Sequence, residues 1–461
     1  MKRSIGWLAM GAALLAACGG DDGAEANEPA TCTLPDCSAI RPLAAVNQPL
    51  SAVGDAGVLS FRPGAAGKGA LLFLPVEGEP VLVADAVPRE TVAVDAAGSS
   101  ILYLVPTGAP TPWGDMVGEL HRFGVRSGED RQLLDDARGD HFGACGDWVW
   151  SWHGGAASAN CGWMSALQLS TGRWFDLGES CDTREVEALA VFSADCTRLA
   201  TAPGRTGGVG VHLLGTGESA RLGSGNGRFV GSPALDRVVV PGSTPGALVL
   251  HDLAGGAPRE LGTGRALAFS PAGTLLVYEA DGRLLLVAEG EPVAIAEGFL
   301  RVEALGFAPD ERRVAWIELG RDEARRLVVY DRALEQRAVI DEAAFSWNEG
   351  PVPAIEPTPL HFAAGGRALL YTRRTAGGIE LARWDFATGE AQALGAIDGT
   401  PPQVDATGAF AGFLGADGSL RLASLETAES WLVAPAASGA LFVGRNLVWA
   451  DGASGWIVPL P

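Results

Sequence analysis

Cysteine is the residue type with the most varied chemistry in this sequence of 461 residues. Thiols pair as disulfides in an oxidising compartment, and they hold zinc when they lie close together, as in Cys-x-x-Cys. No Cys-x-x-Cys occurs here, and His141 and His153 form no ligand pattern with the cysteines, so we expect disulfides and no metal site. Sequence spacing leaves several pairings open. Short loops favour sequential pairing of the six cysteines that follow Cys18, namely Cys32 with Cys37, Cys145 with Cys161, and Cys181 with Cys196.

The sequence lacks the common motifs of catalysis. It contains no Gly-x-Ser-x-Gly nucleophile elbow, no His-Glu-x-x-His zinc motif and no Asp-x-Asp-x-Asp-Gly calcium loop. The glycine-rich run from Gly207 to Gly210 has no lysine to bind phosphate. The six histidines show no paired spacing. We therefore expect a protein that is not an enzyme and that uses no cofactor.

The N-terminal segment carries a targeting signal. Lys2 and Arg3 precede an uncharged apolar run from Ile5 to Ala17, which is too short to span a bilayer as a permanent helix. The run ends in Leu-Ala-Ala-Cys at Cys18, which resembles the lipobox of bacterial lipoproteins. This resemblance implies a signal peptide over residues 1–17 and a lipid on the Cys18 thiol. It also implies sorting to the outer membrane where the host has two membranes.

The charge of the chain limits its partners. Lys and Arg number 34 against 55 Asp and Glu, which gives a formal net charge of −21. Such a charge opposes nucleic acid and anionic lipid surfaces, so membrane attachment depends on the lipid at Cys18. Residues 18–40 begin with an acidic stretch poor in apolar side chains, which indicates a flexible tether. Residues 41–461 form one folded domain, which we expect to be a monomer.

An internal sequence repeat organises this domain. Each copy has an apolar anchor, a tight turn and a second apolar run that begins shortly after the turn. The clearest copies begin at Phe192, Phe269, Phe307 and Phe362, and weaker copies begin at Val94, Phe142, Gly231 and Val404. The anchors at positions 192, 231, 269 and 307 are evenly spaced, and so regular a spacing indicates a structural repeat.

Each copy has room for four short antiparallel strands separated by glycine and proline turns. Such a unit is one blade of a propeller, and it must stack against neighbours in a ring to bury both of its faces. We therefore predict an all-β fold, a single β-propeller of about eight four-stranded blades, with seven to nine compatible with the pattern.

The frame Phe269-Ser270-Pro271-x-Gly273 resembles TolB-like and WD-repeat-like propellers, whose usual signature is Phe/Trp-Ser-Pro-Asp-Gly. The resemblance covers roughly residues 90–460. The Asp-Gly turn is replaced by Ala272-Gly273, Asp310-Glu311 and Asp195-Cys196 in three of the copies. The motif implies the fold and carries no chemistry of its own.

Two aromatic features are candidate binding sites. Trp148, Trp150 and Trp152 alternate along one strand, so their rings share a face. We expect that face to be packed between blades. The alternative is an aromatic platform for sugar or peptide ligands, of which Trp152 and His153 at the strand end are the most exposed members.

The second feature is an insertion. The interval from Phe307 to Phe362 is longer than the regular repeat, and the surplus lies between Asp341 and Pro359. We expect this proline-rich segment to project from one rim of the ring, with Phe345 and Trp347 as anchors for a partner.

These observations predict a cell-envelope lipoprotein that acts as a non-catalytic binding or scaffolding propeller through protein or glycan contacts. The alternative is a propeller-type hydrolase or lyase with its active site at the central channel. The lining of that channel distinguishes the two, because catalysis needs clustered His, Asp, Glu or Arg.

Overall fold

The structure is a computed structural model that describes residues 32–43, 49–65, 68–89, 91–95, 97–108, 116–153, 161–181, 190–201, 208–223, 229–288, 290–346, 358–452 and 454–461. Within these ranges the chain consists of strands and turns, with two short 3₁₀ helices, η1 (Cys37–Ala39) and η3 (Ala364–Gly366). None of the described residues belongs to a helix long and apolar enough to cross a membrane. The predicted signal peptide and Cys18 lie outside the described residues.

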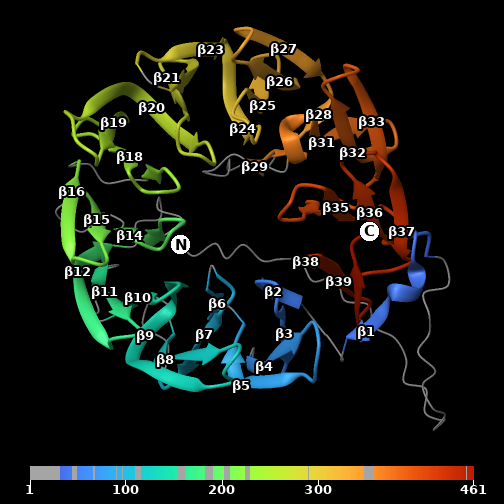
Figure 1. Ribbon diagram of the computed structural model, residues 1–461. Coiled ribbons are helices and arrows are strands. Elements are labelled where there is room, and N and C mark those ends of the chain that lie inside the picture. Colours follow the sequence, from blue (N-terminus) through green and yellow to red (C-terminus); the bar gives the residue numbers. More distant parts are fainter. Residues whose placement is uncertain are drawn as a thin grey trace.

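The strands form antiparallel units that follow one another around a ring (Figure 1). The first strands are β1 (Arg41–Leu43), β2 (Pro49–Val53), β3 (Gly57–Pro63), β4 (Lys68–Pro75), β5 (Val81–Pro88), β6 (Val92–Val94), β7 (Ser100–Pro106), β8 (Val117–Gly124), β9 (Asp130–Cys145), β10 (Trp148–His153), β11 (Cys161–Gln168), β12 (Arg173–Cys181), β13 (Ala190–Phe192), β14 (Arg198–Thr201), β15 (Val209–Leu213) and β16 (Glu218–Leu222).

The second half of the ring begins with β17 (Val230–Gly231), β18 (Arg237–Pro241), β19 (Ala247–Asp252), β20 (Arg259–Phe269), β21 (Leu276–Ala280), β22 (Arg283–Val287), β23 (Val293–Glu297), β24 (Phe299–Phe307), β25 (Arg313–Gly320), β26 (Arg325–Asp331) and β27 (Gln336–Asp341). It ends with β28 (Ala344–Phe345), β29 (Thr358–Pro359), β30 (His361–Phe362), β31 (Ala368–Thr375), β32 (Gly378–Asp385), β33 (Glu390–Ala396), β34 (Gln403–Val404), β35 (Phe410–Leu414), β36 (Leu420–Ser424), β37 (Ser430–Ala434), β38 (Gly439–Val443), β39 (Asn446–Ala450) and β40 (Gly455–Pro459).

A strand from the N-terminal end closes the ring. Strand β1 pairs with β40, with Arg41 opposite Ile457 and Leu43 opposite Gly455, and so completes the sheet of β38, β39 and β40. Pairing the two ends of the chain in one sheet fastens the first and last units to each other, which holds the ring closed.

The predicted single all-β propeller is confirmed, and the strands of the described ranges form eight continuous sheets. Two of these sheets have seven strands, because β9 and β20 are long enough to serve two units each. The first part of each long strand is the outer strand of one unit, and its last part is the inner strand of the next. Counted as four-stranded units, the described ring therefore has ten, compared with the predicted number of about eight and its range of seven to nine.

The serine of the repeat motif closes the turn between the first two strands of a unit. In three units its Oγ accepts a hydrogen bond from the backbone N–H five residues later, and Asp405 does the same with a carboxylate oxygen. The bonds run from Arg198 to Ser193 (2.9 Å), Arg237 to Ser232 (3.1 Å), Leu275 to Ser270 (3.0 Å) and Phe410 to Asp405 (2.7 Å). The motif thus satisfies buried backbone donors at the inner turns.

One disulfide follows the predicted pairing and one does not. Cys32 is bonded to Cys37, as predicted. Cys145 is bonded to Cys196, so the predictions that Cys145 pairs with Cys161 and Cys181 with Cys196 are wrong. Cys145 ends β9 and Cys196 lies in the β13–β14 turn. These are inner turns of neighbouring units, which the ring brings together although 51 residues separate them.

Cys161 and Cys181 occupy directly opposed backbone positions on β11 and β12, and their side chains lie outside the described structure.

The folded body begins by residue 32, earlier than the predicted boundary at residue 41. The backbone N–H of Thr33 donates to the carbonyl oxygen of Leu432 (2.8 Å), and the N–H of Leu432 donates to Thr33 Oγ1 (2.8 Å). Leu34 is buried against the last two units. Residues 32–40 therefore pack along β37, and the part of the predicted tether before residue 32 lies outside the described ranges.

Candidate functional site

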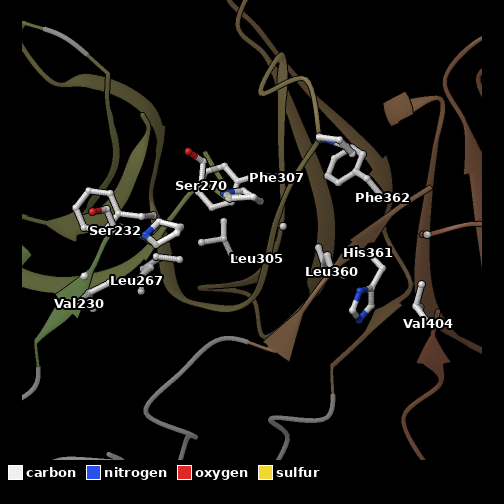
Figure 2. A pocket seen from close by; sticks show the side chains of 18 of the residues that line it. Val230, Ser232, Leu267, Ser270, Leu305, Phe307, Leu360, His361, Phe362 and Val404 are labelled. Carbon is white, nitrogen blue, oxygen red and sulfur yellow. The ribbon is translucent and has the colours of Figure 1, made fainter. Parts of the chain in front are cut away.

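The inner strands of six units surround a cavity of about 860 Å³ at the centre of the ring. Strands β13, β17, β20, β24, β30 and β34 each contribute side chains to it. Figure 2 shows Val230 and Leu267 on one side of this space, Leu305 and Phe307 in the middle, and His361 beyond them. We call this space the central channel.

The lining of the central channel is largely apolar. Val191, which is 41% exposed, lines the space. Val230, Leu267, Leu305 and Leu360 also line it, and Leu267 and Leu305 are themselves largely buried. Among the described lining residues, His361 and Asp405 are the two ionisable ones. An apolar concave surface with few polar groups is typical of a binding site.

Asp405 is committed to the backbone. Its carboxylate accepts hydrogen bonds from the N–H groups of Thr407 (3.1 Å), Ala409 (2.8 Å) and Phe410 (2.7 Å). A carboxylate held in this way supports its turn and has little freedom to act as an acid or a base. His361 is half-buried, and its burial lowers the pKa of the imidazole below the usual value, so the ring is neutral at pH 7.

The serines of the lining are also occupied. Ser232 Oγ donates to Asp236 Oδ1 (2.5 Å) while it accepts from the Arg237 N–H, and Ser270 Oγ accepts from the Leu275 N–H. No described serine of the channel has a hydrogen bond to His361, so a nucleophile activated by an imidazole is not assembled here.

Some ionisable residues elsewhere in the described chain form buried ion pairs. The side chain of Glu303 is fully buried, and it binds Arg301 Nη2 (2.6 Å) and Arg325 Nε (2.7 Å). No group of three or more His, Cys, Asp or Glu among the described residues could hold a metal ion. These charges join two residues of β24 to one of β26, the strand beyond β25, and do not line the central channel.

The insertion interrupts an inner strand, and residues 347–357, which were predicted to project from a rim, lie outside the described residues. Both β28 and β30 pair with β31, where Phe345 lies opposite Thr372 and His361 lies opposite Leu370. The innermost strand of this unit is therefore split opposite Tyr371, and the chain between residues 345 and 361 departs at the split. We call the β28–β33 sheet the split unit.

The returning end of the insertion lies against the neighbouring inner strand. Strand β29 pairs with β24 in parallel, and the N–H of Leu360 donates to the carbonyl oxygen of Leu305 (2.9 Å). A Cβ on Gly306 would lie 2.3 Å from the carbonyl oxygen of Leu360. Glycine at 306 therefore permits this close approach.

Phe345 is not an exposed anchor. Its side chain is 7% exposed, and the guanidinium carbon of Arg374 lies 5.4 Å from the ring centroid. The prediction of a partner contact at Phe345 is therefore wrong, because β28 packs the ring into the blade. Trp347, the second predicted anchor, lies outside the described residues.

The tryptophan strand is packed between units. Trp148, Trp150 and Trp152 belong to one buried cluster with Met164, and Trp152 is 1% exposed. The expected packed face is confirmed, and the binding role predicted for Trp152 is wrong. Strand β10 continues to His153, whose side chain lies outside the described structure.

The residues that line the central channel were not among the site residues predicted from the sequence. Val191, Val230, Ala268 and His361 each stand one position before a repeat anchor, and all four line the space. The anchors Phe192, Gly231, Phe269 and Phe362 line the space as well, so the anchor and the residue before it both reach the channel. The repeat frame therefore contained the signal, which the search for catalytic motifs could not reveal.

The comparisons with known proteins support the fold alone. No family model matches the chain, and no curated protein matches it in sequence. A solved eukaryotic initiation factor is similar over 82% of this chain and 98% of its own, with a TM-score of 0.53 and 12% identity. The β-propeller domain of Cps50 (Swd1) from Myceliophteria thermophila is similar over 59% of this chain and 96% of its own, with a TM-score of 0.32 and 13% identity.

Proposed function

We propose that the protein is a cell-envelope lipoprotein whose propeller binds an apolar segment of a partner protein at the central channel, without catalysis. The lipobox-like sequence before Cys18 supports the anchor, and the repeat frame supports a TolB-like or WD-repeat-like subfamily. The protein acts as a monomer held at the membrane by its lipid, in the outer membrane where the host has two membranes.

The observation that carries the proposal is the lining of the central channel. It presents Val191, Val230, Leu305 and Phe307, and its one uncommitted ionisable side chain among the described residues is that of His361. Burial of apolar side chains contributes about 25 cal/mol per Å² to association, before the costs of binding. A protein segment with a few apolar side chains has the complementary chemistry.

A glycan partner has less support. Sugars bind through flat aromatic faces together with dense polar contacts. The tryptophans that could have formed such a platform, Trp148 to Trp152, are packed between blades. The alternative of a propeller-type hydrolase or lyase needs a second ionisable group close to His361, and Asp405 is held by its own turn.

Substitution of Val191 by aspartate tests the binding proposal. Val191 and Val339 are both 41% exposed valines, on the inner strand β13 and the outer strand β27 respectively. A charge at Val191 would be desolvated by an apolar partner, so Val191→Asp should reduce partner retention at least tenfold, while Val339→Asp should not. Retention on immobilised protein is compared after both variants are shown to melt within about 3 °C of the parent. Equal retention by the two variants would contradict the proposal.

The anchor is tested separately. Cys18→Ala should abolish incorporation of labelled palmitate and leave an unprocessed precursor. Labelling that persists in this variant would contradict lipidation at Cys18. Recovery of the protein only in inner-membrane fractions would contradict outer-membrane sorting.

A further inference from the structure

A second and smaller cavity lies beside the central channel at the split unit. Its volume is about 290 Å³, and its lining comes from three neighbouring sheets, with Ala304 and Ile317 on one side, Leu370 in the middle and Gln403 on the other. Leu360, His361 and Val404 line both this cavity and the channel, so the two spaces adjoin. We call the smaller space the side cavity.

The split in the inner strand accounts for the position of the side cavity. An unbroken strand would continue from Phe345 to His361 past Tyr371. Here the chain departs after Phe345, and both residues line the side cavity together with Tyr371. The hydroxyl of Tyr371 is already bonded to Asp341 Oδ2 (2.7 Å), and that of Thr372 to the carbonyl oxygen of Phe345 (2.8 Å).

Two polar side chains of the lining remain available. Within the described part of the chain, neither the imidazole of His361 nor the amide of Gln403 makes a hydrogen bond, and each can donate and accept one. No Asp, Glu, Lys or Arg is among the described residues that line the side cavity. A charged ligand would therefore lose its hydration without gaining an opposite charge, whereas an uncharged ligand would not.

We propose that the side cavity binds a small uncharged molecule with an apolar body and one hydroxyl or carbonyl group, which His361 and Gln403 hydrogen-bond. The volume is close to the lower limit of about 300 Å³ for small-molecule sites, and a cavity of about 150 Å³ already holds benzene. A single substituted ring is therefore the appropriate size. This site adjoins the partner-binding surface of the channel and shares Leu360, His361 and Val404 with it, but binding of a small molecule there does not require the partner.

The test uses 4-fluorophenol as the probe and the mature protein as the receptor, with binding followed by ¹⁹F NMR. Gln403 is exposed, so Gln403→Trp should fold and fill the side cavity, whereas Val191→Trp narrows the central channel alone. We expect binding in the millimolar range or tighter, at least tenfold weaker in Gln403→Trp and unchanged in Val191→Trp.

The hydrogen bond is tested by His361→Leu, with His251→Leu on β19 as the matched control outside both cavities. Loss of one hydrogen bond should weaken the binding of 4-fluorophenol about fivefold in His361→Leu. Fluorobenzene, which lacks the hydroxyl, should bind both variants equally, and this comparison holds even where His361→Leu lowers stability. No binding to the parent protein, or a loss confined to Val191→Trp, would overturn the proposal.

Discussion

The stretch from β17 to β24 and the split unit build the same four-stranded blade from differently spaced sequence. In the first, the anchors Gly231, Phe269 and Phe307 recur at an even interval, and each inner strand is continuous. In the second, the interval from Phe307 to Phe362 is longer, and the inner strand is made from two short pieces. Strands β31, β32 and β33 pair as a regular blade despite the insertion.

The contact between neighbouring blades is also preserved across the insertion. Arg237 Nη1 donates to the carbonyl oxygen of Gly273 (3.3 Å), and Arg313 Nη1 donates to that of Gly366 (3.1 Å). Both arginines stand six residues after an anchor and reach the equivalent turn of the next unit. The described ends of the insertion, Phe345 and His361, therefore belong to the inner strand of the split unit, and the inter-blade contacts remain intact.

Truncation of a buried aromatic side chain in each region should give the largest effects. Trp316 is fully buried between regular units, and its Nε1 donates to Glu318 Oε2 (2.9 Å). Trp316→Ala should therefore lower the free energy of unfolding by about 4–5 kcal/mol. Phe345→Ala should lower it by only about 3 kcal/mol, because the ring already borders the side cavity. Chemical denaturation measures both values, and a larger loss for Phe345→Ala would contradict the comparison.

Removal of the disulfide between regular units should have an effect close in size to that of Trp316→Ala. Loop closure by Cys145 and Cys196 spans 51 residues, against 5 for Cys32 and Cys37. The entropy of loop closure then predicts that the free energy of unfolding falls by about 4 kcal/mol in Cys145→Ser and by about 2 kcal/mol in Cys32→Ser. Denaturation of the two variants in parallel checks this order. The reverse order would mean that the segment of residues 32–40 contributes more to stability than the disulfide between blades.

A smaller effect is expected where the insertion returns to the fold. Gly306→Ala places a Cβ against the Leu360 carbonyl, which belongs to the backbone and has to move. We therefore expect the free energy of unfolding to fall by about 2 kcal/mol. Gly439 begins the inner strand β38 and has no atom within 4 Å of an added Cβ. Gly439→Ala should therefore change stability by less than about 0.5 kcal/mol. Equal effects would show that β29 does not lie against β24.

The features that repeat along the chain were predictable from the sequence. The anchors, the Ser-Pro turns and the alternation of Trp148 to Trp152 specify blades and the packing between them, because each depends on local spacing. The Cys32–Cys37 pairing was predictable for the same reason. The unit count was not, because β9 and β20 continue from one unit into the next without the turn that would mark a boundary.

The features that depend on closing the ring were not predictable. The partner of Cys145 lies in a neighbouring unit, distant in sequence but adjacent in space, which loop length alone cannot indicate. The strand that the insertion interrupts was not predictable either, because the two residues of β28 carry too little pattern to reveal an inner strand. The lining residue His361 follows from the repeat frame only once the inner strand is known.

Site-specific crosslinking in the cell shows whether a partner binds in the channel lined by the inner strands. A photoreactive residue is placed at Val191 on β13 or at Val339 on β27, two positions of equal exposure. We expect one discrete crosslinked partner from position 191 and none from position 339, with the product identified by mass spectrometry. The same product from both positions, or a product only from position 339, would contradict binding in the channel.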